Sequence, residues 1–474
     1  MSNSEQPGTG VMFVYRIAFV AAIGGFLFGF DLGMIGAANL FLKDQFHLSD
    51  AQFGLATASA GIGCILGPFL GAWLCDAIGR KRTMIVAAFL LALSAVVTAA
   101  PEILSGSSDQ SIITVFNIFR AIGGLGVGLC SIASPMYIAE VAPPKKRGQL
   151  GMMYQLAIVC GHVVAPLIGY LVVISLPQSD GVAEIAWQQP WRWMFASETV
   201  CVLMFVSFVF SLPRSPRWLA EKGRHDEALN VLSQVEGPDY ARREIEEIRS
   251  SLEQETGGWS ELLAPGMRYA LLIGILLAFF NNWTGWSVIG AYIPTLFEMS
   301  GLEDRAAAIG KFALTYGAMG LMTVVSLVLM DRVGRRPLWM FASLLMAAIT
   351  CATGLVFHLQ LTGSIVLIVI MLCTVPHGVA LGGIPWLMMS ELFPTRVRAK
   401  AVSITTTFLW VAIFSGAYLF PALTTASTAL VGSVGGAFWL FTVICILSFL
   451  FGWWMMPETK GRTLEEIAES WKKP

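Results

Sequence analysis

Long apolar stretches and short polar stretches alternate along the whole chain. Twelve of the apolar stretches are long enough to cross about 30 Å of hydrocarbon as a helix. The pattern therefore predicts an all-α membrane protein with twelve transmembrane helices. The predicted spans are 13–38, 53–75, 83–101, 112–139, 149–174, 191–212, 268–297, 307–330, 337–357, 364–390, 400–423 and 434–456.

A polar stretch, residues 213–267, separates the sixth predicted span from the seventh. Its apolar residues recur at the spacing of an amphipathic helix, which predicts short surface helices and no second catalytic domain. The expected organisation is an N-terminal six-helix bundle (1–212), this linker (213–267), a C-terminal six-helix bundle (268–456) and a short tail (457–474). The apolar linker residues are Ala228, Leu229, Leu232, Val235, Ile245, Ile248 and Leu252.

Basic residues are distributed unevenly between the two sides of the predicted spans. Of the 30 Lys and Arg residues, 24 lie in the even-numbered gaps between spans or in the tail. Short loops rich in Lys and Arg stay on the cytoplasmic side of a membrane. The distribution predicts that both termini and the linker are cytoplasmic, and we expect the membrane to be a bacterial inner membrane.

One charged pattern occurs twice, about half a chain apart. Asp76-Ala-Ile-Gly-Arg80 recurs as Asp331-Arg-Val-Gly-Arg335, 255 residues later. A second pattern, an acid followed seven positions later by Arg, occurs at Glu140 and again at Glu391, 251 residues later. A third pattern begins with proline at Pro213 and recurs at Pro457, 244 residues later. A parallel repeat of this size in a membrane protein indicates two similar helical bundles with a site at their interface.

Composition excludes an ordinary soluble protein. Hydrophobic residues make up 56% of the 474 residues and charged residues 13%, whereas soluble domains average about 25% charged. The eight Cys residues lack the short paired spacings of zinc sites, so no metal or other cofactor is expected. Neither a nucleophile–His–acid set nor a phosphate-binding loop is recognisable, so we expect neither an enzyme nor a nucleic-acid-binding protein.

Seven short motifs, spread along the chain from Gly24 to Glu466, carry a family resemblance. Together they resemble the sugar porter family of the major facilitator superfamily over essentially the whole chain. They are most similar to the motifs of its bacterial proton-coupled members and of its facilitative glucose transporters. The resemblance implies the major facilitator fold of two pseudo-symmetric six-helix bundles, and transport of a sugar or related polyol by alternating access. The matching stretches are Gly24–Asp31, Pro135–Glu140, Trp191–Glu198, Asp331–Arg336, Ile384–Trp386, Glu391–Pro394 and Pro457–Glu466.

Asp31 and Arg120 are the candidate proton-coupling pair. Asp31 lies inside an apolar span, where an acid is costly unless it is paired or protonated, and Arg120 lies inside the fourth span. Burial favours the neutral carboxyl group, whereas a nearby Arg favours the carboxylate. The resemblance implies that Asp31 carries the proton and Arg120 responds to its charge, because facilitative members have a neutral residue at the acid position. A static ion pair is the alternative.

The repeated charges are candidates for a cytoplasmic gate. Ion-pair clusters at helix ends would hold the two halves together when the cytoplasmic side is closed, and break when it opens. The alternative is that these charges only set topology. Ala77 and Arg214 stand where the family usually has Arg and Glu, which suggests a weaker latch here. The candidate gating charges are Asp76, Arg80, Glu140, Arg147, Glu198, Asp331, Arg335, Glu391, Arg398 and Glu458.

Polar and aromatic residues in the spans form a candidate substrate site. Sugars are bound by hydrogen-bonding side chains together with an aromatic surface. By the resemblance, Gln155 and Trp386 contact the sugar, while Phe28 and Trp410 form part of the pocket wall. The complete candidate set is Phe28, Gln155, His162, Asn281, Asn282, Ser287, His377, Gly382, Trp386 and Trp410.

Several of these positions depart from the family pattern. Asn281 and Asn282 replace a Gln–Gln pair, and Ser287 replaces an amide. His162 and His377 stand where the proton-coupled xylose-type members have Gln and Phe, although either could simply be a satisfied packing residue. The pocket is therefore expected to be of sugar type but reshaped.

The prediction from sequence is a proton-coupled symporter that works as a monomer. A facilitative uniporter or exchanger is the main alternative, and a cyclitol or a hydroxylated acid is an alternative substrate. A transporter-like nutrient receptor is disfavoured because such receptors resemble transporters with long signalling tails, and the tails here are short.

Overall fold

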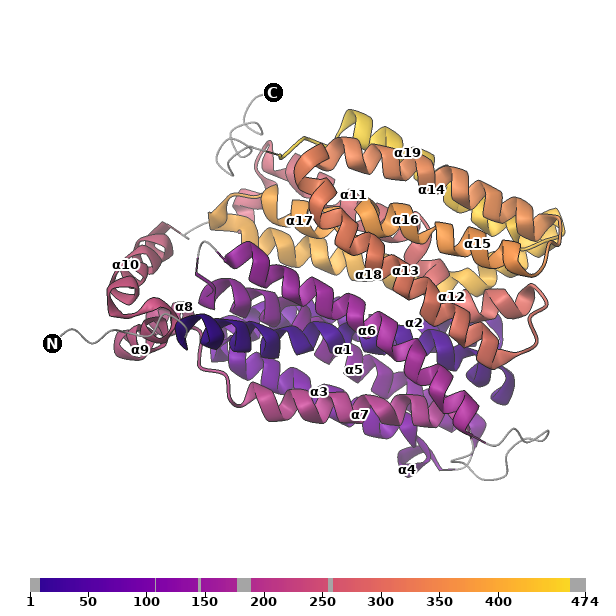
Figure 1. The fold of residues 1–474 in the computed structure, drawn as a ribbon, viewed down its shortest axis with the longest axis horizontal. Helices are drawn as coiled ribbons and strands as arrows, with labels where there is room; N and C mark the ends of the chain where they lie inside the picture. The colour runs from indigo at the N-terminus through magenta and orange to yellow at the C-terminus, as the bar shows by residue number, and fades with distance from the viewer. Residues whose placement is uncertain (1–8, 107, 144–145, 177–188, 255–258, 461–474) are drawn as a thin grey trace.

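The computed structural model describes residues 9–106, 108–143, 146–176, 189–254 and 259–460. Within these residues the chain is helical, and twelve spans are long and apolar enough to cross a membrane. The described chain contains no strand, so the all-α fold predicted from the sequence is confirmed. Two groups of helices lie side by side in Figure 1, the first in indigo to magenta and the second in orange to yellow.

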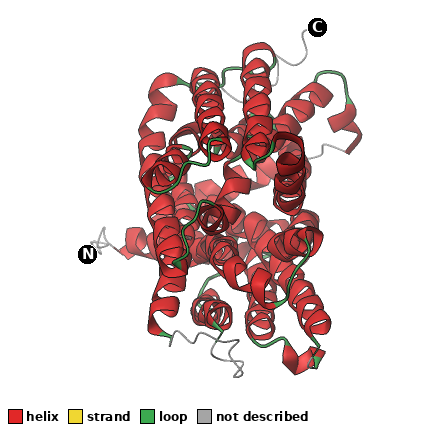
Figure 2. Cartoon of the chain, turned by 90° about the vertical axis from the view of Figure 1, so that its right-hand side faces the viewer, coloured by secondary structure: helices red, strands yellow, loops and turns green. Residues whose placement is uncertain are grey.

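The first group is a six-helix bundle. Its long helices run nearly parallel to the long axis of the molecule and are seen end-on in Figure 2. They are α1 (Thr9–Gln45), α2 (Asp50–Ile78), α3 (Arg80–Ala99), α5 (Asp109–Val141), α6 (Arg147–Ser175) and α7 (Pro190–Val209), with the short α4 (Glu102–Ser105) between α3 and α5.

The second group supplies the other six spans. Four of its helices are long: α13 (Arg305–Val333), α14 (Arg335–His358), α18 (Thr395–Val431) and α19 (Gly435–Trp454). The other two spans are interrupted. One is built from α11 (Met267–Trp283) and α12 (Trp286–Met299), and the other from α15 (Ser364–Leu372), α16 (Thr374–Pro376), the π-helix η3 (His377–Leu381) and α17 (Ile384–Glu391).

These two interruptions depart from the continuous spans predicted over 268–297 and 364–390. Gly285 has a φ of 113°, a conformation outside the α-helix that glycine tolerates, so the chain turns between α11 and α12. In the other span Pro376 lacks a backbone N–H, and the wider turn of η3 follows it directly. Both interruptions face the other bundle across a cavity.

The linker forms a small helical cap at one end of the bundles. It contains α8 (Pro216–Glu221), α9 (His225–Glu236), α10 (Pro238–Gln254) and the 3-10 helix η2 (Trp259–Leu263). In Figure 1, α8, α9 and α10 lie beyond the left-hand end of the membrane-spanning helices. Ala228, Leu232 and Ile248 are buried within this cap, as the amphipathic spacing predicts. We call this side of the molecule the linker end and the opposite side the far end.

Close approach of α1 and α6 gives the first bundle part of its rigidity. A Cβ atom on Gly29 of α1 would lie 1.9 Å from the carbonyl oxygen of Ile158 in α6. In return, a Cβ atom on Gly161 of α6 would lie 2.1 Å from the carbonyl oxygen of Phe26. Only glycine allows two helix backbones to pack at this distance, and dense packing replaces hydrophobic driving force between helices in lipid.

Polar contacts join the two bundles at the far end. Arg305, at the start of α13, forms an ion pair with Asp44 of α1. Thr425 of α18 donates a hydrogen bond of 2.5 Å to Asp50 at the start of α2. Asn39 of α1 donates a hydrogen bond of 3.2 Å to the carbonyl oxygen of Ala291. The far end is therefore the closed end of the interface in this conformation.

We expect Arg305→Gln to loosen the far end, because it removes the ion pair between the bundles. Exposed pairs contribute about 0.2–1 kcal/mol, which corresponds to a shift of up to roughly fivefold in the equilibrium between far-end closed and open forms. Spin labels at Ile103 and Glu303, both exposed at the far end of opposite bundles, would report a larger long-distance population. Cys160 and Cys351 would be replaced by Ser to avoid background labelling.

Asp44→Asn provides the matched control for that measurement. If the ion pair is responsible, Asp44→Asn should have the same effect, and the double variant should add little to either single one. Independent, additive shifts would show that the pair does not hold the far end closed.

Candidate functional site

A cavity of about 540 Å³ lies between the two bundles. Helices α1, α2, α5 and α6 line it from one bundle, and the two interrupted spans with α13 and α18 line it from the other. It extends toward the linker end, where Met152, Met330 and Leu387 line it. Of the candidate substrate residues, it brings together Phe28, Gln155, His162, Asn281, Asn282, Ser287, His377, Gly382 and Trp386.

The cavity lining is mostly apolar, and the polar groups among its described residues carry no formal charge. None of its described lining residues is Asp, Glu, Lys or Arg. Its hydrogen-bonding groups are amides, hydroxyls, imidazoles and tyrosine, and Trp386 and Phe28 add aromatic surface. Such a lining matches the hydroxyl groups and C–H faces of a neutral polyhydroxylated molecule, whereas an ion would be buried without a partner.

His162 has a defined hydrogen-bonding role on the wall of the first bundle. Its Nδ1 lies 3.0 Å from the carbonyl oxygen of Ile158, one helical turn earlier. A carbonyl oxygen only accepts, so Nδ1 carries the hydrogen and Nε2 of the neutral ring is an acceptor. The ring also stacks on Tyr316 of the other bundle, with centroids 5.0 Å apart and planes 18° apart.

The two asparagines bind backbone groups of the second bundle. Asn281 donates hydrogen bonds to the carbonyl oxygens of Leu381 (2.6 Å) and Gly382 (3.3 Å), which lie at the end of the π-helix. Asn282 donates to the carbonyl oxygens of Ala278 (3.1 Å) and Leu409 (3.4 Å), and its Oδ1 is buried with no hydrogen-bond partner. Asn281 thus ties α11 to the end of the π-helix, and Asn282 ties α11 to α18.

Trp410 differs from the expectation that it forms part of the pocket wall. It is fully buried and does not belong to the cavity lining. Its ring lies behind Phe28, with centroids 5.1 Å apart, and its Nε1 has no hydrogen-bond partner. Trp410 therefore supports Phe28 from the other bundle in this conformation.

Asp31 and Arg120 form a buried ion pair away from the cavity. Their side chains are 3% and 1% exposed, and neither residue lines the cavity. Asp31 Oδ2 and two of the three guanidinium nitrogens of Arg120 have no hydrogen-bond partner. The guanidinium also lies 5.2 Å from the ring centre of Phe195. A pair with so many unused donors and acceptors can exchange partners or take up a proton.

Glu198 was assigned to the cytoplasmic charges, and the structure contradicts that placement. It lies in the middle of α7, is 3% exposed, and interacts electrostatically with both Asp31 and Arg120. The predicted span 191–212 already includes Glu198, which is incompatible with a place among the charges at the cytoplasmic helix ends. The proximity of Glu198 to the pair depends on how α7 packs against α1 and α5, which sequence reasoning did not consider.

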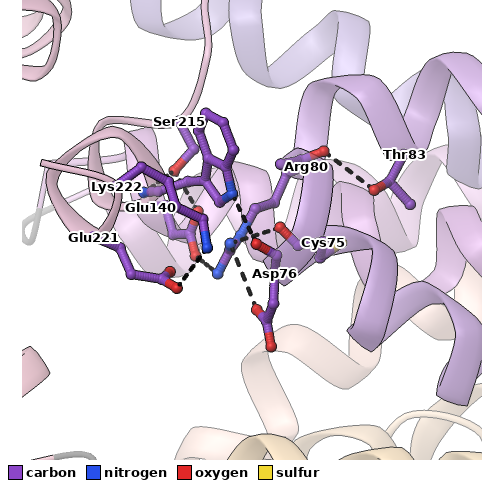
Figure 3. A network of polar contacts seen from close by, with 10 residues as sticks. Cys75, Asp76, Arg80, Thr83, Glu140, Ser215, Glu221 and Lys222 are labelled. Carbon is purple, nitrogen blue, oxygen red and sulfur yellow. Dashed lines mark hydrogen bonds and ion pairs between the residues drawn. The ribbon is translucent and has the colours of Figure 1, made fainter. Parts of the chain in front are cut away.

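The first copy of the charged repeat forms a network at the linker end (Figure 3). Arg80 lies 2.8 Å from Glu140 and 3.7 Å from Asp76. Ser215 donates a hydrogen bond to Glu140, and the indole N–H of Trp218 donates one to the Asp76 carbonyl oxygen. The network links α2, α3, α5 and the linker, and all of these described contacts lie on the N-terminal side of the interface.

The second copy repeats this arrangement. Arg335 lies 3.2 Å from Glu391, and Thr459 donates a hydrogen bond of 2.6 Å to Glu391, as Ser215 does to Glu140. Glu458 accepts hydrogen bonds from the backbone N–H groups of Arg335 and Arg336, so it caps the start of α14.

The two copies differ at the position of this cap. Arg214 replaces the carboxylate, and its guanidinium lies 5.3 Å from the ring centre of Trp218. Trp218 packs over Gly79, where Glu458 packs over Gly334 in the other copy.

Three predicted gating charges remain to be placed. Arg398 donates a hydrogen bond of 3.1 Å to the carbonyl oxygen of Phe393 in its own segment. The side chains of Arg147 and Asp331 lie outside the described residues, although their helices are placed.

Tyr316 and Trp286 also line the cavity, and they were not predicted from the sequence, because a single aromatic residue in an apolar span gives no sign of facing a cavity.

Comparison with known proteins places this architecture among transporters. The model of a family described as "Sugar (and other) transporter" matches residues 17–471. The chain is 38% identical to the arabinose-proton symporter of Bacillus subtilis (strain 168), over 97% of this chain and 96% of that relative. It is 32% identical to the D-xylose-proton symporter of Escherichia coli (strain K12), over 97% and 96%.

A solved structure shows the same fold. The xylose transporter XylE from E. coli, in a partially occluded inward open conformation, matches with a TM-score of 0.84 and 30% identity. The match covers 95% of this chain and 100% of that one.

We expect Glu140→Gln to destabilise the protein more than Glu391→Gln. Arg80 and Glu140 are 5% and 9% exposed, whereas Arg335 and Glu391 are 12% and 20% exposed. Neutralising the more buried acid leaves a guanidinium poorly compensated away from water, at a cost of about 3 kcal/mol, and the cost falls with exposure. Thermal unfolding of the purified variants would show the larger drop in Tm for Glu140→Gln. Equal drops would contradict the burial argument.

Proposed function

This chain belongs to the Sugar (and other) transporter family, and on that premise we propose that it carries a neutral sugar or related polyol by alternating access, in symport with a proton. The observation that carries the proposal is the separation of two sites. An uncharged cavity lies between the bundles, and a buried acid–base pair lies beside it in the first bundle. The first supplies a substrate site and the second a proton site.

The substrate proposal rests on the chemistry of the cavity. Gln155, Asn281 and Asn282 line the cavity with amide groups suited to sugar hydroxyl groups, and Trp386 lines it with an aromatic surface suited to the apolar face of a sugar ring. The volume of about 540 Å³ accommodates a monosaccharide with water. The uncharged lining favours neutral sugars and cyclitols over hydroxylated acids. The names of the two relatives, which specify arabinose and xylose, agree with a small neutral sugar.

The proton proposal rests on the Asp31–Arg120 pair. An acid buried at 3% exposure stays ionised only through its partner, so a movement that separates the two favours uptake of a proton. Glu198 is the second acid near Arg120, and it can balance the guanidinium while Asp31 is protonated.

Orientation and gating follow from the charge distribution. We propose that the linker end is cytoplasmic, as the positive-inside rule indicates, in a bacterial inner membrane with the protein acting as a monomer. The conformation described here is then inward-facing, because the cavity extends toward the linker end and three of the four described side-chain hydrogen bonds and ion pairs between the bundles lie at the far end. The fourth, from Ser403 to the carbonyl oxygen of Pro68, lies nearer the linker end. We propose that the bundles 1–212 and 268–456 move as bodies, that 213–267 connects them, and that 457–474 is a short cytoplasmic tail. Its residues Glu458 and Thr459 contact the second bundle.

In this scheme the Arg80–Glu140 and Arg335–Glu391 clusters act as a gate. Each lies within one bundle in the inward-facing form. In the outward-facing form the two clusters would approach each other and hold the cytoplasmic side closed. The missing carboxylate at Arg214 weakens the N-terminal cluster, which favours the inward-facing form.

Trp386→Ala and Gln155→Ala should each weaken sugar binding by roughly tenfold or more, because one removes an aromatic surface and the other leaves sugar hydroxyls without a partner. Isothermal calorimetry with a panel of pentoses, hexoses and cyclitols would measure the dissociation constants. Thr323→Ala, a change in the lining nearer the linker end, serves as control. Unchanged affinity in both Trp386→Ala and Gln155→Ala would place the substrate elsewhere.

Asp31→Asn should abolish sugar accumulation driven by a pH gradient while leaving sugar exchange measurable. Asn is uncharged at every pH, so it imitates the protonated acid and cannot carry a proton. Uptake and counterflow in proteoliposomes, with and without an imposed gradient, would separate the two activities. If the wild-type protein shows no gradient-driven accumulation, the facilitative alternative replaces symport. If Asp31→Asn still accumulates sugar, another group carries the proton.

A further inference from the structure

Helix α1 has two functional faces at the level of Asp31. One face carries Asp31, which pairs with Arg120 of α5. The other carries Gly29, Gly33 and Gly36, spaced i, i+4 and i+7, so they share one side of the helix. A Cβ atom on Gly29 would lie 2.9 Å from Nδ1 of His162, and one on Gly33 would lie 3.4 Å from the His162 Cα. The glycine face of α1 therefore rests directly on α6 at His162.

His162 continues this contact into the second bundle. Its ring is held by the hydrogen bond to the Ile158 carbonyl oxygen, and it stacks on Tyr316 of α13 at 5.0 Å. A second branch reaches the same tyrosine. A Cβ atom on Gly36 would lie 2.8 Å from the ring of Phe312, which meets Tyr316 edge-on at 5.1 Å. Two sets of contacts, one through His162 and one through Phe312, therefore connect α1 to Tyr316.

Beyond Tyr316, ring contacts lead to both interrupted spans. Trp286 is the first residue of α12, immediately after the break at Gly285, and its ring lies 5.7 Å from Tyr316. His377 is the first residue of the π-helix η3, and its ring lies 5.9 Å from Trp286. We call His162, Tyr316, Trp286 and His377 the ring relay.

We propose that the ring relay couples the proton site to the substrate gate, with His162 and Tyr316 as positioning residues that transmit a shift of α1 to the breaks at Gly285 and η3. This proposal deepens the proposed symport and rests on it. The proton site does not touch the cavity, so coupling between proton and sugar must pass through packed groups. The ring relay is a continuous path of contacts between the two.

The packing explains why a small movement would be transmitted. When Asp31 takes up a proton, its ionic attraction to Arg120 is lost and α1 is free to move relative to α5. The glycine face has no side chains of its own to absorb that movement. Gly29 meets the backbone of Ile158, and Gly36 meets the ring of Phe312. Close-packed interiors pass displacement on. The rings of the ring relay pack next to these contacts. The last two, Trp286 and His377, lie at the break after Gly285 and at the start of η3.

The test compares two activities in the same proteoliposomes. For each variant, the ratio of gradient-driven accumulation to counterflow exchange is measured at equal protein content. We expect His162→Leu, His162→Gln and Tyr316→Leu to lower this ratio by roughly threefold or more, because each breaks the stack. Tyr316→Phe keeps the ring and should restore most of the ratio. Gln155→Ala, two turns away on α6, weakens sugar binding in both assays and should leave the ratio unchanged.

A structural readout separates coupling from sugar contact. Hydrogen exchange of residues 284–290 is compared between wild type and Asp31→Asn without sugar. We expect Asp31→Asn to change exchange at this break, and the added change Tyr316→Leu to remove the difference. Tyr316→Phe in the same background should preserve it. This measurement needs only folded protein.

The outcomes distinguish the two proposals. A wild-type protein that fails to accumulate sugar overturns symport itself. If the wild type accumulates sugar but the leucine variants keep its ratio, the ring relay is overturned and symport stands. The ring relay is also overturned if Tyr316→Phe is as defective as Tyr316→Leu, since that result would assign the effect to the hydroxyl group.

Discussion

Charged groups buried in an apolar bundle must find their partners inside the protein, and this constraint organises the molecule. The ion pair of Asp31 and Arg120 is 3% and 1% exposed, in a region where no water replaces a lost partner. Helices α1 and α5 are therefore held together at one point by charge and along α6 by glycine packing. Any reaction that changes the charge of Asp31 acts on the position of α1.

The same constraint explains the separation between the proposed proton site and the cavity. A neutral sugar needs hydrogen-bonding groups and an aromatic surface, and the described lining supplies these without a formal charge. An acid in that cavity would be hydrated when the cavity is open, and its protonation would then depend less on the distance to its basic partner. Asp31 is 3% exposed and lies outside the cavity lining, so the proposed coupling would depend on the contacts between α1, α6 and α13.

The two copies of the charged repeat form similar contacts at the linker end but differ at one position. Arg80, Glu140 and Ser215 are matched by Arg335, Glu391 and Thr459, so each bundle ties its linker-end helices with an Arg, an acid and a hydroxyl. Only the C-terminal copy adds a carboxylate cap, because Arg214 occupies the corresponding position in the other. The two halves of the proposed gate therefore differ in their contacts although their geometry is repeated.

The sequence by itself determined the twelve spans, the duplicated bundles and nine residues of the cavity lining, because long apolar stretches and repeated motifs are local features that lipid and topology enforce. Tertiary structure alone decided which side chains meet. Glu198 was grouped with the cytoplasmic charges but interacts with Arg120 inside the first bundle, and Trp410 packs against Phe28 outside the cavity lining. The stack of His162 on Tyr316 joins residues 154 positions apart, and no local pattern encodes it, because it depends on how two bundles approach each other.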